Sequence, residues 1–181
     1  MNKQNPWKTL STKTIYENDW IRLREDQVIR PDGNPGIYSV VETRIATGVI
    51  AINSNNEIYL VGQYRYPTKV YSWEIIEGGS DKNESAINAA KRELREEAGI
   101  VANSWKQLGD EIHLSNCHSS EVGYLFIAKE LEFGEASPDE TEVLSIKKVS
   151  LEQALEMVTS GEIKDAMSII ALQRAKDLLF S

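Results

Sequence analysis

The chain has 181 residues, of which 41% are hydrophobic and 27% charged, and its formal net charge is −8. This length is close to that of one domain and allows a hydrophobic core without disulfide or metal crosslinks. The composition excludes a disordered, collagen-like or coiled-coil chain, and the acidic balance argues against binding nucleic acid. A small anionic ligand is still compatible with it, because a bound divalent metal reverses the local field.

Cys117 is the only cysteine, so no internal disulfide can form. No apolar run approaches the roughly 20 residues that a membrane-spanning helix needs. The first residues, MNKQNPWKTL, lack the apolar core of a signal peptide. We therefore expect a cytoplasmic protein that makes no contact with a membrane.

The first part of the chain is rich in segments typical of strands. Strands are predicted over residues 12–17, 20–29, 37–42, 47–52 and 58–64. The stretch PDGNPG at 31–36 is dense in turn formers and separates the first hairpin from the later strands. We therefore expect an N-terminal β subdomain over residues 1–36 and a main domain over residues 37–181.

Helices appear in the second half. The clearest covers 84–98, where good helix formers are followed by Gly99 at the position of a C-terminal cap. Its apolar residues recur at helical spacing from Ala86 to Ala98 and are expected to face a sheet. Strands over 123–129 and 143–149 and helices over 151–159 and 165–180 complete a mixed α/β or α+β sandwich.

The stretch GGSDKNESAINAAKRELREEAGI, at 78–100, carries the clearest chemical signal. Glu93, Glu96 and Glu97 are spaced at i, i+3 and i+4, which puts three carboxylates on one helix face. Such neighbours repel and raise one another's pKa values, and a hard divalent cation such as Mg²⁺ or Mn²⁺ removes that conflict. A solvated acidic face is the alternative, but the interleaved Arg92 and Arg95 and the bracketing glycines favour a functional site.

Read from Gly78, this stretch matches the Nudix box, G-x5-E-x7-R-E-U-x-E-E-x-G-U, where U is a bulky aliphatic residue. The chain therefore resembles the Nudix hydrolases, which implies a Nudix α/β/α sandwich with a mixed β-sheet and, here, an N-terminal antiparallel β extension. The resemblance also implies metal-dependent catalysis by box residues. Mg²⁺, or Mn²⁺, is then expected on the carboxylates of Glu93, Glu96 and Glu97 and the main-chain carbonyl of Glu77, with Arg92 orienting the cluster and Glu84 supporting it.

Resemblance extends beyond the box. VGQYRYP at 61–67 and WEIIEGG at 73–79 look like the ADP-ribose and nucleoside-diphosphate-sugar pyrophosphatases. That branch implies hydrolysis of the diphosphate in sugars of the ADP-ribose, ADP-glucose or GDP-mannose type, to nucleoside monophosphate and sugar phosphate. It also implies a homodimer formed through the N-terminal extension. By the same resemblance Glu140 is the general base and Glu142 an accessory metal ligand, although an ordinary exposed acidic loop is an equal alternative.

Several residues outside the box are candidates for substrate binding. Arg65 and Arg44 are able to clamp phosphate, but a structural ion pair is the alternative for both and is preferred for Arg44. Trp73 and Trp20 are candidates for stacking a nucleobase, although an aromatic residue in a strand is more often part of a core. Glu121 matches a glutamate common at this point of the family and is expected to line the site.

Two departures from the family pattern bear on the substrate. Asn116 stands near a position where ADP-ribose pyrophosphatases carry proline, and EIIEGG replaces the usual E-x-x-A-G. Both favour a broader or different nucleotide sugar over ADP-ribose alone. The alternatives are a Nudix hydrolase of nucleoside triphosphates, dinucleoside polyphosphates or capped RNA, and a nucleotide-sugar sensor without activity. The complete set of box glutamates argues against the sensor.

Overall fold

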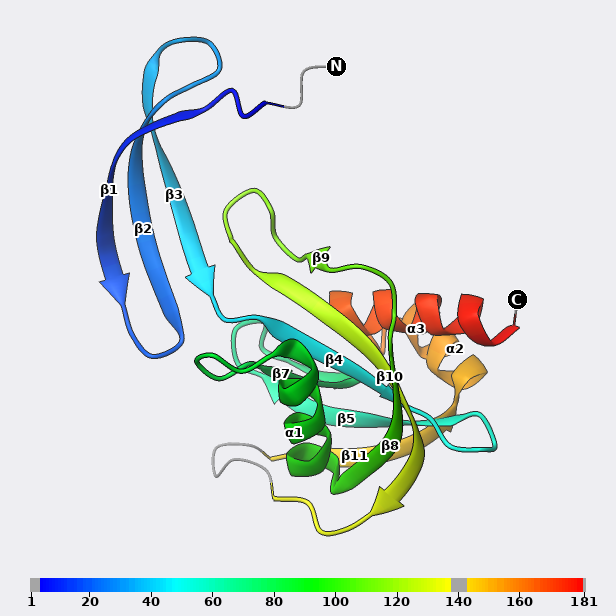
Figure 1. Ribbon diagram of the computed structural model, residues 1–181. Coiled ribbons are helices and arrows are strands. Elements are labelled where there is room, and N and C mark those ends of the chain that lie inside the picture. The colour runs from blue at the N-terminus through cyan, green and yellow to red at the C-terminus, as the bar shows by residue number, and fades with distance from the viewer. Residues whose placement is uncertain (1–3, 138–142, 181) are drawn as a thin grey trace. The chain divides into compact units, whose positions relative to one another are not determined.

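The computed structural model describes residues 4–137 and 143–180 (Figure 1). The chain divides into two compact units, one made of Met1–Arg44 with His113–Val122 and one made of Ile45–Ile112 with Gly123–Ser181. We call them the N-terminal unit and the body, and each is described by itself. Within the described ranges, no helix is long and apolar enough to cross a membrane.

The N-terminal unit is built on a three-stranded antiparallel sheet in the order β1 (Lys8–Glu17), β2 (Ile21–Ile29) and β3 (Pro35–Thr43). The Asn18 side chain accepts hydrogen bonds from the backbone N–H groups of Trp20 and Ile21, which fixes the first turn. The turn formers at 31–36 connect β2 to β3. Because β3 pairs with β2 along its whole length, the division by contacts falls after Arg44, whereas the turn formers led to a boundary predicted after Gly36.

The segment His113–Val122 belongs to the same unit. The Tyr38 hydroxyl donates to the carbonyl of Cys117 at 2.7 Å, and Val41 forms an isolated bridge with Ser119. The Cys117 thiol itself is exposed. These contacts hold the segment against β3.

The body contains two sheets. The mixed sheet has the order β7 (Ile76–Gly79), β4 (Ala46–Ala51), β10 (Val122–Phe133) and β8 (Ile100–Gln107), with β9 (Ile112–His113) also paired to β10. Only the β4–β10 pair of this path is parallel. The second sheet is antiparallel, in the order β11 (Ser145–Ser150), β5 (Glu57–Arg65) and β6 (Val70–Glu74).

The three predicted helices are present as α1 (Ala86–Ala98), α2 (Leu151–Ser160) and α3 (Ala166–Phe180). Ser85 begins α1 by accepting a hydrogen bond from the backbone of Asn88, and Gly99 ends it in the left-handed conformation with φ +63°. Ser150 forms a capping box with Gln153 at the start of α2. Local capping signals therefore set the helix ends close to where the sequence predicts them.

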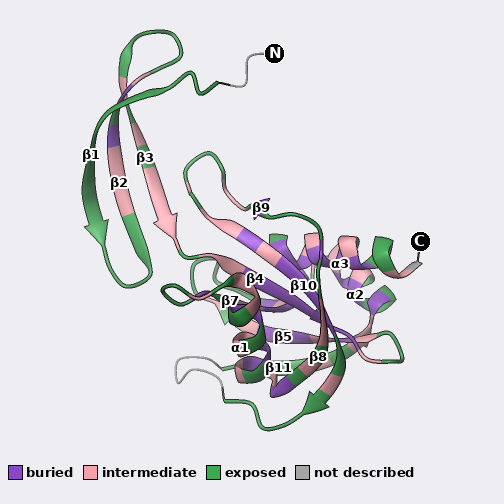
Figure 2. Cartoon of the chain, in the orientation of Figure 1, coloured by how far each residue is buried: buried purple, intermediate pink, exposed green. Residues whose placement is uncertain are grey.

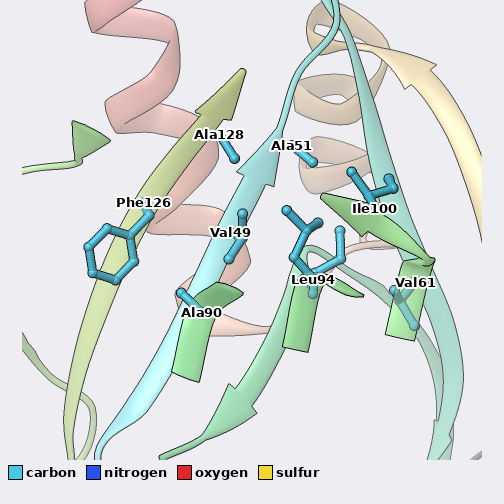
Figure 3. Packing of buried hydrophobic residues seen from close by; sticks show 9 residues of the cluster. Val49, Ala51, Val61, Ala90, Leu94, Ile100, Phe126 and Ala128 are labelled. Carbon is cyan, nitrogen blue, oxygen red and sulfur yellow. The ribbon is translucent and has the colours of Figure 1, made fainter. Parts of the chain in front are cut away.

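Helices cover both faces of the mixed sheet. Val49 of β4 belongs to the core cluster that includes Leu94 of α1, and Figure 3 shows both side chains in that cluster. The preceding residue in the strand, Gly48, faces the opposite way: a side chain there would meet Met167 of α3. This arrangement is the α/β/α sandwich expected from the sequence, and it places the box helix directly on the sheet.

Candidate active site in the box

Gly78, the first residue of the box, lies against Glu93 of α1 because it lacks a side chain. A Cβ at Gly78 would lie 2.0 Å from Cδ and 2.1 Å from Oε1 of Glu93. Any larger residue in β7 would therefore displace the Glu93 carboxylate from its place against the strand. The fixed spacing between this glycine and this glutamate has a direct steric reason.

Arg92 crosslinks the box. Its guanidinium donates to Glu93 Oε1 at 2.7 Å, to Glu96 Oε2 at 3.1 Å and to the carbonyl of Gly79 at 2.8 Å. It also bonds both carboxylate oxygens of Glu84, at 3.2 and 3.0 Å. The Glu84 hydrogen bond is the largest cause of the raised pKa of Arg92, and in return Arg92 lowers the pKa of Glu84. One side chain thus ties the loop before α1 to the acidic face of α1.

Glu97 joins the last turn of α1 to β7. Its side chain is buried, with the residue 4% exposed, and Oε2 accepts a hydrogen bond from the backbone N–H of Glu77 at 3.4 Å. Burial on this scale is unusual for a glutamate outside a paired or functional site. Glu97 therefore fixes the part of β7 that ends in the box glycines.

The Glu77 side chain turns toward α3. Its Oε1 accepts a hydrogen bond from the Ser168 hydroxyl at 2.8 Å, and Ser168 itself accepts one from the backbone N–H of Ile75 at 3.0 Å. Burial of the carboxyl group, followed by the neighbouring charge of Asp165, raises the pKa of Glu77 well above its usual range. The carbonyl of Glu77, rather than this side chain, is the group that we expect to bind a metal.

The chemistry of the donor set fits a hard divalent cation. Glu93, Glu96 and Glu97 offer only oxygen ligands from one helix face, as Mg²⁺ requires. In the arrangement described, Arg92 pairs with Glu93 and Glu96. Over residues 4–137 and 143–180, no group of three or more His, Cys, Asp or Glu side chains is gathered closely enough to hold a metal ion. The three glutamates thus have the right donor atoms for a divalent cation and share one helix face, while Arg92 lies between Glu93 and Glu96.

The candidate substrate residues in the body make contacts within the protein. Arg65 forms a bidentate ion pair with the buried carboxylate of Glu74 through Nε and an Nη atom. The ring of Trp73 lies over Gly62, where a Cβ would be 2.7 Å from the ring. The Nζ atom of Lys147 lies 4.0 Å from the centre of the same ring. Arg65 thus makes the structural ion pair that the sequence left open as its alternative. Trp73 packs on the neighbouring strand and is not among the buried core residues described, so its place in substrate binding stays a prediction.

The remaining candidates belong to the N-terminal unit or lie outside the described residues. Arg44, Trp20 and Glu121 belong to the N-terminal unit. The Arg44 guanidinium donates to the carbonyl of Asp19 at 2.8 Å, and Trp20 is 70% exposed. Glu140 and Glu142 lie outside the described residues. Within the body, the structure brings together the box residues and Glu77.

Sequence reasoning missed Glu74, Asp165 and Ser168. Asp165 caps α3 by accepting a hydrogen bond from the backbone N–H of Ser168 at 2.7 Å, and an aspartate directly before a helix was a usable signal for it. Ser168 carries no local signal, because its partner Glu77 is 91 positions away.

Comparison with known proteins gives matches to two family models. A model described as the nucleoside diphosphate sugar hydrolase N-terminal domain matches residues 7–41, and a model of the NUDIX domain matches residues 42–168. The second match covers well over half of the chain.

Curated relatives match along nearly the whole chain. A methanol dehydrogenase activator of Bacillus methanolicus is 32% identical over 175 residues, which cover 96% of this chain and 94% of that protein. An ADP-ribose pyrophosphatase of Bacillus subtilis is 31% identical over 168 residues, with 92% and 90% covered. Among solved structures, that of an ADP compounds hydrolase superposes with a TM-score of 0.87 at 21% identity and covers 99% of this chain and 97% of that one.

Proposed function

Because this chain belongs to the Nudix family, we propose that it is a Mg²⁺-dependent hydrolase of nucleoside diphosphate sugars of the ADP-ribose, ADP-glucose or GDP-mannose type. Water attacks one phosphorus atom of the diphosphate, the phosphoanhydride bond breaks, and the products are a nucleoside monophosphate and a sugar phosphate. The hydrolase class follows from the match over residues 42–168 and from the pyrophosphatase relatives. Relatives named for ADP-ribose and for GDP-mannose support the substrate class.

One observation carries the site: the acidic row of α1 is locked to the glycine turn of the box. Glu93 rests against Gly78, and Arg92 joins Glu93 and Glu96 to the carbonyl of Gly79. These contacts place the carboxylates beside the glycine turn, with Arg92 paired to Glu93 and Glu96. A divalent cation held by Glu93, Glu96, Glu97 and the carbonyl of Glu77 would neutralise the diphosphate oxygens and lower the pKa of a bound water.

We assign the remaining roles to residues whose chemistry suits them. Glu140 would accept the proton of the attacking water, and Glu142 would add a ligand to the metal. Arg65 would bind a phosphate oxygen with the part of its guanidinium that Glu74 leaves accessible, since its side chain is 40% exposed. Arg92 holds the carboxylates in place and does not itself touch the reacting atoms.

A panel of substrates tests the reaction. Purified protein with Mg²⁺ should convert ADP-ribose, ADP-glucose or GDP-mannose to a nucleoside monophosphate and a sugar phosphate, identified by chromatography, and a chelator should stop turnover. Release of pyrophosphate from nucleoside triphosphates alone would reject the substrate class. Binding of nucleotide sugars without turnover would instead favour a sensor.

A pair of conservative changes tests the base. Glu140→Gln should lower kcat by more than it raises KM, because the residue acts on water in the transition state and not on bound substrate. Glu142→Gln should instead raise the Mg²⁺ concentration needed for half-maximal activity. An unchanged kcat in Glu140→Gln would assign the base to another residue.

A homodimer is proposed through the N-terminal unit. Large apolar side chains on its strands and turns are exposed, namely Leu10, Ile15, Tyr16, Trp20, Ile21 and Ile37. A soluble protein rarely leaves such a surface uncovered, and a second copy of the unit offers a matching one. Light scattering should give twice the chain mass, and Ile15→Asp should give the single mass. We also propose a cytoplasmic protein that does not bind nucleic acid.

A further inference from the structure

A cleft of about 530 Å³ opens in the body between the β5–β6 hairpin and the start of α3. Its volume lies in the range of small-ligand sites. Four of its lining residues carry charge: Arg65, Glu74, Lys164 and Asp165. It is distinct from the acidic face of α1, because none of the box glutamates of that helix lines it.

The polar groups of the cleft are only partly used by the protein. Ser72 lines the cleft and is 5% exposed, and its hydroxyl forms no hydrogen bond with another described residue. Its oxygen is not among the buried polar atoms that lack a partner, so the hydroxyl is reachable from the cleft and is able to bond to water or a ligand. Lys164 is exposed at the same cleft and forms no ion pair with any described residue. Both groups are therefore available to a ligand.

The charge and the side-chain types of the lining limit the chemical class of that ligand. Two cations, Arg65 and Lys164, face two carboxylates, Glu74 and Asp165, so the formal charge of the lining is zero. Apart from the one phosphate oxygen proposed for Arg65, this lining does not suit a dianionic diphosphate, and its described residues include no aromatic side chain to stack a nucleobase. A neutral ring with several hydroxyl groups fits, because each hydroxyl both donates and accepts hydrogen bonds. Pro67 and Val70 add an apolar surface for its carbon atoms.

The cleft adjoins the box. Glu74 precedes the box glycine Gly78 by four positions, which extended chain spans in about 13 Å. Asp165 also accepts a hydrogen bond from the backbone N–H of Ser168, whose hydroxyl donates to Glu77, the residue directly before Gly78. A group attached to a diphosphate at the box is therefore within reach of the cleft.

We propose that this cleft binds the sugar of the nucleoside diphosphate sugar, with Ser72 and Lys164 as specificity-determining residues. The assignment rests on the proposed function and adds to it the place where the sugar is distinguished from the nucleoside. Glu74 and Asp165 accept hydrogen bonds from sugar hydroxyls, while Ser72 and Lys164 donate to them.

The test compares Ser72→Ala and Lys164→Ala with wild-type protein on ADP-ribose and ADP-glucose, with AMP and ribose 5-phosphate as inhibitors. Lys176→Ala is the matched control, because Lys176 is exposed on α3 but outside the cleft. Each cleft variant should raise the KM for at least one sugar about three- to tenfold, as expected for one lost hydrogen bond, with kcat nearly unchanged. The inhibition constant of ribose 5-phosphate should rise with it, and that of AMP should stay the same.

The other outcomes are distinct. An equal rise in the AMP constant would mean that the cleft binds the nucleoside end, and unchanged constants in both variants would mean that no part of the substrate enters it; either overturns the assignment. Turnover of nucleotide sugars by the wild type in the same assay keeps the proposed function when the cleft assignment fails. A wild type that turns over no nucleotide sugar overturns both. Thermal melts of each variant separate these effects from misfolding.

Discussion

The N-terminal unit and the body differ in how they bury their side chains. Every residue of β1 is exposed, and Val28 is the one buried hydrophobic residue among those described in the N-terminal unit. In the body, Leu94, Ile50 and many others are at most 1% exposed. Figure 2 shows the contrast, with buried residues concentrated on the strands and helices of the body.

The comparison separates two ways of stabilising a sheet. The body buries its sheets under its own helices, so the box is held by a core that the same chain supplies. The N-terminal unit relies on strand pairing and surface ion pairs such as Arg22–Glu42, which contribute little each in water. A three-stranded sheet of that kind gains most of its stability from whatever covers its apolar side chains.

The largest effect is expected from a box carboxylate. Glu97→Gln should lower kcat on the order of 10³-fold, because a charged ligand of the proposed metal site is lost while the acceptor for the Glu77 N–H remains. Steady-state kinetics across a Mg²⁺ titration measures it. Glu156→Gln, on the exposed side of α2, is the control. Full activity at saturating Mg²⁺ would contradict the assignment of Glu97 as a metal ligand.

A matched pair of apolar truncations addresses the contrast in burial directly. Leu94→Ala should reduce the free energy of unfolding by about 2–5 kcal/mol, since it leaves a cavity in the core. Ile15→Ala in β1, at 49% exposure, should change it by less than about 0.5 kcal/mol in dilute monomer. Urea unfolding measures both. Equal losses would contradict the difference drawn between the two units.

The ion pair of Glu84 should make stability depend on pH. Arg92 holds the pKa of Glu84 below its usual value, so its stabilising effect is present above pH of about 4.3 and is lost as the pH falls through the folded-state pKa. Glu84→Gln should cost about 1–2 kcal/mol at pH 7, and the difference from wild type should shrink toward pH of about 3. Glu17→Gln, at the exposed end of β1, is the control. A difference that stays constant with pH would rule out the pair as its source.

The smallest effect is expected at a helix cap in the body. Ser150→Ala removes the capping box of α2 and should cost about 1 kcal/mol. Amide hydrogen exchange should show faster exchange at Gln153, whose N–H bonds to the Ser150 hydroxyl at 3.1 Å. Unchanged exchange at Gln153 would mean that packing, and not the cap, fixes the start of α2.

Helices were easier to predict than strands because their signals are local. Ser85 and Gly99 mark both ends of α1, and its period places Leu94 on the sheet. By contrast β7 (Ile76–Gly79) contains two glycines, which disfavour strands, and it is a strand because β4 pairs with it at Thr47 and Gly78. Strands β6 and β8 were not predicted either, since each depends on a partner distant in the sequence.

The site likewise contains features that local sequence predicts and features that depend on distant contacts. The row of Glu93, Glu96 and Glu97 follows from helical spacing, and the repulsion of its carboxylates indicated a divalent cation. The family resemblance added the diphosphate reaction. The contacts of Arg92 with Glu84 and of Ser168 with Glu77 depend on how distant segments fold together. No residue pattern indicated that Ser72 would line a cleft. The cleft forms only where the β5–β6 hairpin meets the start of α3 in the folded chain.

The exposed thiol of Cys117 has a practical consequence. It is the chain's only cysteine, and its backbone is fastened to Tyr38 by a hydrogen bond of 2.7 Å. A nitroxide attached to it would report from one defined point in the N-terminal unit of each molecule. Dipolar coupling between two such labels would then give a single intermolecular distance, so the geometry of self-association is measurable by electron spin resonance without introducing any new residue.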